Sequence, residues 1–186
     1  MTPRRVGPVE VVEAVSALAG RDTGRTRFVA IDGFGAAGKT GLVARIADRV
    51  PAVDVVHIDD FAAPDVAEWD WPRFAAEIVA PLAAGRPARY GVQGWDQPLP
   101  VGTATLDPGR VLVAEGVSVT RRELAVAWDL TVWLDVPGDV RLARARARDG
   151  EALMPRWLDD WLPSEQRWAE RDRPWQHVDL VVDELA

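Results

Sequence analysis

Two residue types that most proteins use freely are almost missing from this sequence. It has no cysteine, and Lys39 is the only lysine among its 22 Lys and Arg residues. Without cysteine the chain can form neither a disulfide nor a thiolate metal site. Positive charge is also scarce, because 29 acidic residues give a formal net charge of −7 at pH 7. A general nucleic-acid or anionic-membrane binder usually carries a positive surface, so we expect neither activity.

Long hydrophobic runs are missing as well. No segment approaches the roughly 18 apolar residues of a membrane span. Glu10 and Glu13 interrupt the apolar run near the N-terminus, where a signal peptide needs it unbroken. The chain has 186 residues, of which 48% are hydrophobic, and this suffices for the core of one domain but not of two. We therefore expect a single soluble domain over residues 1–186, located in the cytoplasm.

Short apolar segments alternate with longer amphipathic ones along the chain. This alternation predicts a three-layer α/β sandwich, with a five-stranded, mostly parallel sheet and helices on both faces. Residues 103–106, before a Pro-Gly turn, are expected to form one arm of a hairpin or a loop over the sheet edge. The expected strands are residues 27–31, 53–58, 111–114, 130–134 and 178–182. The expected helices are residues 9–19, 38–50, 71–84, 140–149 and 155–171, with a break at Pro163 left open.

One motif carries a specific chemistry. The stretch from Gly33 to Thr40 fits G-x-x-x-x-G-K-S/T and lies between a predicted strand and a predicted helix. Its glycines let backbone N–H groups surround a phosphate, Lys39 reaches the outer phosphates, and the Thr40 hydroxyl binds Mg²⁺. The compact ammonium of lysine suits such a loop better than the wide guanidinium of arginine. The predicted triphosphate-binding residues are Gly33, Phe34, Gly35, Ala36, Ala37, Gly38, Lys39, Thr40 and Gly41.

The rest of the chain narrows the class of phosphate-binding protein. A switch GTPase reads guanine with an N-K-x-D motif, and the sole lysine already lies in the loop. Motor and AAA-type ATPases carry an aspartate or an acidic pair after a second hydrophobic strand, whereas residues 111–114 are followed by one acid and a glycine, Glu115 and Gly116. What remains is a small kinase that transfers the γ-phosphoryl group to a bound metabolite.

Three further stretches carry a family resemblance. VVHIDDFAAPD, VLVAEGV and RLARARARD follow the loop in that order. Together with the loop they resemble the uridine kinase and nicotinamide riboside kinase group of P-loop kinases, over residues 28–183. The resemblance implies a P-loop NTPase sandwich with a helical lid at roughly residues 149–165. It also implies ATP and Mg²⁺ as cofactors and a small-molecule hydroxyl compound as phosphate acceptor.

Candidate catalytic carboxylates follow two of the predicted strands. The carboxyl ends of parallel strands face the ligand crevice, where a kinase needs a carboxylate to orient the acceptor hydroxyl and accept its proton. The resemblance implies that Asp59 is this base, beside Asp60 and Phe61, and that Glu115 lies near the magnesium with Thr40 and Asp59. A capping role for the two aspartates and an ordinary strand-end role for Glu115 stay open.

Arginines at helical spacing form a second candidate group. Arg141, Arg144 and Arg148 recur at i, i+3 and i+7, so they share one face of the predicted helix. In the resembling family this segment leads into the lid over ATP. The three arginines would then bind the cofactor, and Arg144 would also act in catalysis by stabilising the transferred group. A solvated basic face is the alternative interpretation.

The acceptor site is predicted from weaker matches. Asp70 matches a family aspartate that holds sugar hydroxyls, although Trp71 stands where the family has histidine. Tyr90 matches a tyrosine of the base-binding loop, and Trp95 falls where uridine kinases have histidine. The two rings could stack a base or a sugar face. The predicted acceptor-binding residues are Asp59, Asp60, Phe61, Asp70, Tyr90 and Trp95.

Other conspicuous residues and the alternatives remain. His57 is interpreted as a packed or loop-satisfied residue, and Trp157, Trp161 and Trp168 as packing residues of a core or lid helix. A nucleoside is the favoured acceptor, with a sugar, pantothenate-like or antibiotic alcohol as alternative. An ATP-binding regulatory protein without phosphotransfer is the alternative from another class. The sequence makes no prediction of oligomeric state.

Overall fold

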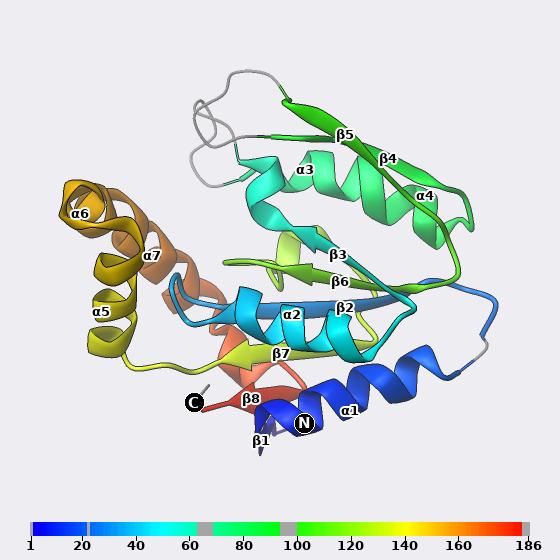
Figure 1. Ribbon diagram of the computed structural model, residues 1–186, viewed down its shortest axis with the longest axis horizontal. Helices are drawn as coiled ribbons and strands as arrows, with labels where there is room; N and C mark the ends of the chain where they lie inside the picture. Colours follow the sequence, from blue (N-terminus) through cyan, green and yellow to red (C-terminus); the bar gives the residue numbers. More distant parts are fainter. Residues whose placement is uncertain (1, 22, 63–68, 94–99, 184–186) are drawn as a thin grey trace.

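The computed structural model describes residues 2–21, 23–62, 69–93 and 100–183. Its centre is a six-stranded sheet in which all five strand pairings are parallel (Figure 1). The predicted α/β class and parallel sheet are confirmed. The strands, in spatial order, are β1 (Arg4–Val6), β8 (Leu180–Val182), β7 (Leu130–Leu134), β2 (Arg27–Gly33), β6 (Val111–Glu115) and β3 (Val53–His57).

The prediction of five strands is wrong by one. β1 adds a sixth strand at the edge of the sheet, where it pairs with β8 alone. Two of its three residues are exposed arginines, Arg4 and Arg5, so the segment has no apolar run that would reveal a strand. It is a strand because β8 offers it unpaired backbone hydrogen-bonding groups.

Side chains alternate between the two faces of the sheet. In β2, Val29 and Ile31 belong to a core beneath α1 (Pro8–Ala19) and α2 (Lys39–Arg49). Phe28 and Ala30 belong to a core on the opposite face. That face is covered by a helical run of α3 (Trp71–Phe74), one π-helical turn (Ala75–Val79) and α4 (Ala80–Ala83), which confirms the predicted helix at residues 71–84. The three layers follow from this alternation.

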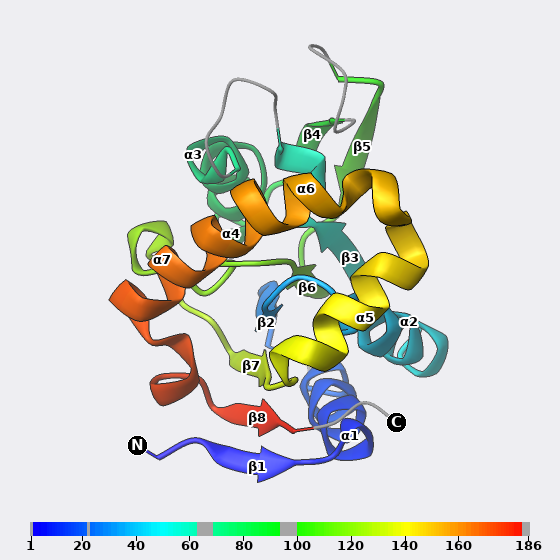
Figure 2. The same cartoon turned by 90° about the vertical axis from the view of Figure 1, so that its left-hand side faces the viewer.

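Three further helices extend beyond the carboxyl ends of the strands. They are α5 (Gly138–Asp149), α6 (Met154–Arg156) and α7 (Leu162–Asp172), and we call them the lid helices. Figure 2 shows them as an arch across the end of the sheet. A π-helical turn (Trp157–Trp161) joins α6 to α7, so the helical run continues through Pro163. The wider turn before Pro163 accommodates the missing N–H, and no break occurs there.

A separate two-stranded antiparallel sheet lies next to α3 and α4. It consists of β4 (Ala88–Val92) and β5 (Gly102–Leu106), seen at the top of Figure 1. β5 is the predicted hairpin arm. The N–H of Gln93, just after β4, donates to the Asp60 carbonyl over 3.0 Å, so this hairpin is tied to the segment that follows β3. None of the helices formed by the described residues has the length and apolar character of a membrane span.

Candidate phosphate-binding and catalytic site

The chain between β2 and α2 folds into a tight loop at the carboxyl end of the sheet. Gly33 has a φ of 147°, and a Cβ added there would lie 2.9 Å from the backbone oxygen of Leu134. Gly38 has a φ of 97° and precedes Lys39, the first residue of α2. Residues with a Cβ rarely adopt either backbone conformation, so the turn itself requires these two glycines.

Lys39 is folded back onto this loop. Its Nζ donates hydrogen bonds of 2.9 Å to the carbonyl oxygens of Gly33 and Phe34, and the residue is 8% exposed. The first turn of α2 adds unpaired backbone N–H groups and a partial positive charge. The loop therefore concentrates hydrogen-bond donors and positive potential in the way that an anion-binding loop requires.

A hydroxyl, a carboxylate and an imidazole meet beside the loop. Thr40 donates from Oγ1 to Oε1 of Glu115 over 2.9 Å, and Nδ1 of His57 lies 2.7 Å from the same oxygen. His57 and Glu115 are paired residues of β3 and β6, which brings them together. Asp59 follows β3 in a short 3-10 turn (Ile58–Phe61).

The two carboxylates have opposite pKa shifts. Burial would raise the pKa of Glu115, but its hydrogen bond with His57 and the charge of Lys39 outweigh burial and lower it. Desolvation by the surrounding protein, followed by the charge of Glu115, raises the pKa of Asp59. The pKa of His57 is raised, chiefly by its hydrogen bond to Glu115. Neighbouring carboxylates whose pKa values are driven apart are suited to different roles.

A cavity of about 670 Å³ opens among the loop, the strand ends and the lid helices. Its volume is in the range of small-molecule and cofactor sites. Asp59 is an exposed residue that opens on this cavity, and the protein around its carboxylate still desolvates it enough to raise its pKa. The lining includes Gly35, Ala36, Gly38, Lys39 and Thr40 from the loop, Asp59 and Glu115 from the strand ends, and Arg144, Arg148, Trp157, Trp161 and Glu165 from the lid. The other predicted loop residues, Gly33, Phe34, Ala37 and Gly41, are not among the lining residues.

The three predicted arginines do not share one environment. Arg144 and Arg148 line the cavity, and Arg148 also forms a bidentate ion pair with Asp149 at 2.7 and 2.9 Å. Arg141 lies outside the lining. Its guanidinium is 4.5 Å from the ring centroid of Phe34, and burial lowers its pKa. Contact between Arg141 and a nucleotide therefore stays a prediction.

Two of the predicted acceptor residues are aromatic side chains near the β4–β5 hairpin: Tyr90 lies in β4, and Phe61 ends the 3-10 turn that contains Asp59. Phe61 and Tyr90 are buried and stack on each other, with ring centroids 5.5 Å apart. Burial raises the pKa of Tyr90 to about 12. Asp70 caps α3, because its Oδ1 accepts from the N–H of Arg73 over 3.0 Å. Asp60, Phe61, Asp70 and Tyr90 are absent from the cavity lining and Trp95 lies outside the described residues, so their part in acceptor binding stays a prediction.

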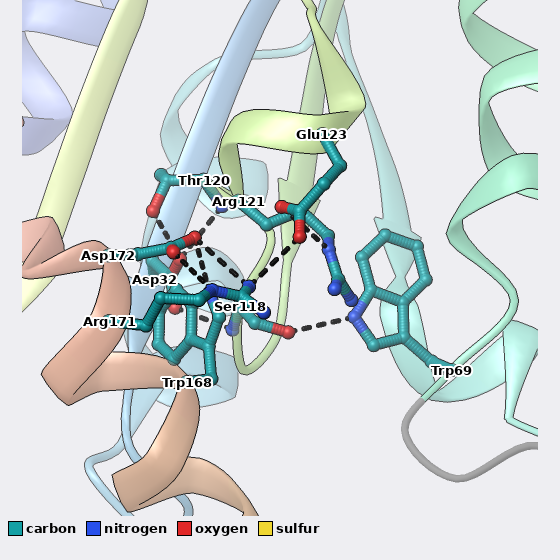
Figure 3. A network of polar contacts seen from close by, with 9 residues as sticks. All are labelled: Asp32, Trp69, Ser118, Thr120, Arg121, Glu123, Trp168, Arg171 and Asp172. Carbon is teal, nitrogen blue, oxygen red and sulfur yellow. Dashed lines mark hydrogen bonds and ion pairs between the residues drawn. The ribbon is translucent and has the colours of Figure 1, made fainter.

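A buried polar network supports the floor of the loop, and the sequence analysis did not identify it. The fully buried Asp32 accepts hydrogen bonds from the N–H groups of Gly33, Ser118 and Thr120 at 2.7 to 2.9 Å. Figure 3 shows that the network continues through Ser118, whose Oγ accepts from Nε1 of Trp69 over 2.9 Å. Asp32 thus joins the start of the loop to the segment that follows Glu115.

The oxygen donors beside the loop fit a magnesium ion. Thr40 and Glu115 offer a hydroxyl and an ionised carboxylate, and Asp59 opens on the same cavity. Within the described part of the chain, no three His, Asp or Glu side chains form a ready-made metal cluster. Mg²⁺ characteristically uses one or two carboxylates and completes its octahedron with water and substrate phosphates. The donor set therefore matches a cation that arrives with a nucleotide.

Comparisons with known proteins rest on structure, because no model of a protein family and no curated protein matches the sequence. A Bacillus stearothermophilus protein, provisionally described as a uridine kinase, is similar with a TM-score of 0.71 and 20% identity, over 95% of this chain and 97% of that one. A Silicibacter protein, provisionally described as a fructose transport system kinase, is similar with a TM-score of 0.75 and 21% identity, over 95% and 98% of the two chains. The chain has the uridine kinase-like P-loop kinase fold.

Proposed function

We propose that the protein is an ATP-dependent kinase that transfers the γ-phosphoryl group of Mg-ATP to a hydroxyl of a small molecule, with a nucleoside as the favoured acceptor. The observation that carries this proposal is the shared cavity. Lys39, Asp59 and Arg144 come from the loop, a strand end and the lid, and all three line it. A phosphate-binding group, a base and a cation that closes over them are the parts that phosphoryl transfer requires.

Each of these residues has a separate task in the proposed reaction. Lys39 and the loop N–H groups hold the phosphates, and Arg144 and Arg148 balance the charge that spreads over the transferred group. Asp59 orients the acceptor hydroxyl and takes its proton as the acceptor oxygen bonds to the γ-phosphorus and the bond from that phosphorus to ADP breaks. The raised pKa of Asp59 favours this proton transfer, because a base works best when its pKa approaches the working pH.

The metal would be held by Thr40 and Glu115. When bound, Mg²⁺ neutralises phosphate charge and helps to align the β- and γ-phosphates. His57 fixes the Glu115 carboxylate through its hydrogen bond and so would orient it for holding the cation. Because ATP is an intracellular cofactor, we also propose that the protein works in the cytoplasm.

The acceptor can be identified by the release of ADP from Mg-ATP. The descriptions of the two similar structures differ, one naming a uridine kinase and the other a kinase of a fructose transport system, so the panel should contain nucleosides, sugars and pantothenate-like and antibiotic alcohols. ADP release stimulated by a nucleoside supports the full proposal. Stimulation by a different alcohol moves the acceptor to the alternative class. A protein that binds ATP but shows no stimulation by any acceptor is a regulatory nucleotide-binding protein.

Lys39 provides the test of the loop. Lys39→Ala is expected to reduce phosphotransfer by about 10²- to 10³-fold, because it removes the charge that the phosphates need. Arg49→Ala is the matched control, since Arg49 is an exposed residue in the last turn of the same helix. Both variants are compared below the thermal midpoint of the less stable one, because Lys39 also bonds two loop carbonyls. Activity of Lys39→Ala at the control rate would remove the loop from the mechanism.

A further inference from the structure

A carboxylate from the lid lies on the phosphate loop itself. Glu165, in α7, places its two carboxylate oxygens 3.0 and 3.1 Å from the backbone nitrogen of Gly35, and this N–H donates to them. Glu165 is 9% exposed, and burial raises its pKa. An acidic side chain that is kept in such a position, at the cost of its desolvation, calls for a physical explanation.

The other side of Gly35 is held by the neighbouring lid helix. Arg141, in α5, donates from NH1 to the Gly35 carbonyl oxygen over 3.3 Å. The same nitrogen lies 3.8 Å from Glu165. One ion pair therefore holds both the N–H and the C=O of Gly35, and each of its two charges neutralises the other. A residue whose N–H and C=O are both held by hydrogen bonds cannot turn freely about its backbone dihedral angles.

The lid also fills the space above Gly35. A Cβ added at Gly35 would lie 2.6 Å from Oε1 of Glu165 and 2.7 Å from ring atoms of Trp157. Gly35 is not among the glycines with positive φ. Glycine is therefore required at this position by the close approach of the lid, and not by the backbone conformation that requires Gly33 and Gly38.

We propose that Glu165 is a positioning residue, which together with Arg141 fixes the backbone of Gly35 and thereby makes the shape of the phosphate loop depend on a closed lid. This inference rests on the proposed function, because the loop needs a fixed shape only if it binds phosphate. When the lid is docked, the loop N–H groups keep the directions that a phosphate needs. When the lid leaves, Gly35 loses both partners and the loop loses its preorganisation for phosphate.

Hydrogen exchange of the nucleotide-free protein tests this coupling. Glu165→Ala is expected to speed exchange of the Gly35 N–H by about tenfold or more, as one lost buried hydrogen bond allows, and to speed exchange in α6 and α7. Glu165→Gln keeps an acceptor oxygen and should restore most of the protection. Glu170→Ala is the control, because Glu170 is exposed on the same helix. Unchanged exchange at Gly35 in Glu165→Ala would overturn the proposal.

ADP binding measured by calorimetry provides a second readout that needs no phosphotransfer. Glu165→Ala should weaken ADP binding by about tenfold, and Glu165→Gln should recover it. Gly35→Ala should also weaken binding, because its methyl group displaces the lid. Gly102→Ala is the control, because Gly102, in β5, has open space for a methyl group and lies outside the cavity lining. Tighter ADP binding in Glu165→Ala would show that Glu165 competes with phosphate and would overturn the proposal. If the unmodified protein binds no ADP, the proposed function fails and exchange alone decides the role of Glu165.

Discussion

Asp59 and Glu115 show how the cavity gives two similar side chains different chemistry. Glu115 shares hydrogen bonds with Thr40 and His57. The carboxylate of Asp59 has no hydrogen-bond partner among the described residues, while it is desolvated and faces the charge of Glu115. Glu115 is thus stabilised as an anion and Asp59 is not. The group that is less stable as an anion is the one that gains more from accepting a proton.

Replacement of Asp59 by asparagine separates the base from a metal ligand. Asp59→Asn should lower kcat by about 10²- to 10⁴-fold, the contribution typical of a positioned acid or base, while the Kd of ATP stays near the unmodified value. Steady-state kinetics and calorimetric ATP titration measure the two quantities. An equal loss of Mg-ATP affinity would make Asp59 a metal ligand.

The same replacement should stabilise the folded protein in a pH-dependent way. The folded state raises the pKa of Asp59 above its ordinary value of 3.8, so its contribution to stability is favourable below that value and is lost as the pH rises through the raised value. Asp59→Asn should therefore raise the thermal midpoint at pH 7, with a gain that disappears as the pH falls towards about 4. Asp48→Asn, on the exposed surface of α2, is the control. A gain that grows on acidification would contradict the raised pKa.

Residues close to a motif could be predicted from the sequence, and residues that act across the fold could not. Lys39 and Thr40 belong to one motif, and the strand pattern placed Asp59 and Glu115 at the same edge of the sheet. The contact between Glu165 and Gly35 joins residues 130 positions apart. No local pattern encodes that distance, and the only signal was an acid among packing tryptophans. The interpretation of His57 as a packed or loop-satisfied residue did not identify Glu115 as its hydrogen-bond partner, for the same reason.

At the scale of elements, prediction succeeded where hydrophobic periodicity is strong. The apolar segment 130–134 is the strand β7 with the same ends, and the helix at residues 71–84 is confirmed. One prediction failed, because β1 is a strand through backbone pairing alone, and such pairing leaves no pattern in the side chains. The break at Pro163 stayed open, because a single proline does not show whether a wider helical turn will accommodate it.

Asp70 combines a structural role with its predicted role in acceptor binding. As the cap of α3, it should cost about 1 kcal/mol of stability when changed to alanine, whereas asparagine keeps a capping oxygen. If its carboxylate also holds the 2′- and 3′-hydroxyls of a nucleoside, both Asp70→Ala and Asp70→Asn should raise the acceptor KM by about tenfold. The measurements are chemical denaturation and acceptor kinetics with a nucleoside and its 2′-deoxy analogue.

The asparagine variant decides between the two roles of Asp70. In Asp70→Asn, the 2′-deoxy analogue should raise the KM little further, because the substitution and the missing hydroxyl both remove the same interaction. A KM at the unmodified value in Asp70→Asn would leave Asp70 as a helix cap only, and would favour an acceptor other than a nucleoside.

At the scale of the whole molecule, parts of the chain that are far apart in sequence form the walls of the cavity. The loop, the strand ends and the lid surround it, so a ligand that bridges them should stabilise the entire fold. At a concentration of 100 times its Kd, Mg-ADP should add about 2.7 kcal/mol, or roughly 5 to 10 °C in thermal midpoint for a chain of this size. Lys39→Ala should abolish most of this shift in a thermal melt. A midpoint that does not respond to Mg-ADP would contradict nucleotide binding in the cavity.

The pairing of β1 with β8 has a consequence for the newly made chain. Arg4 lies opposite Leu180, and β1 has no other partner in the sheet. Because the ribosome makes the chain from its N-terminus, β1 leaves the ribosome long before β8, its only partner strand. The other four strands, β7, β2, β6 and β3, pair with one another without β8. They can therefore form their part of the sheet before β1 has a partner. The phosphate loop, too, emerges well before Glu165, and during translation it exists for a time without its lid.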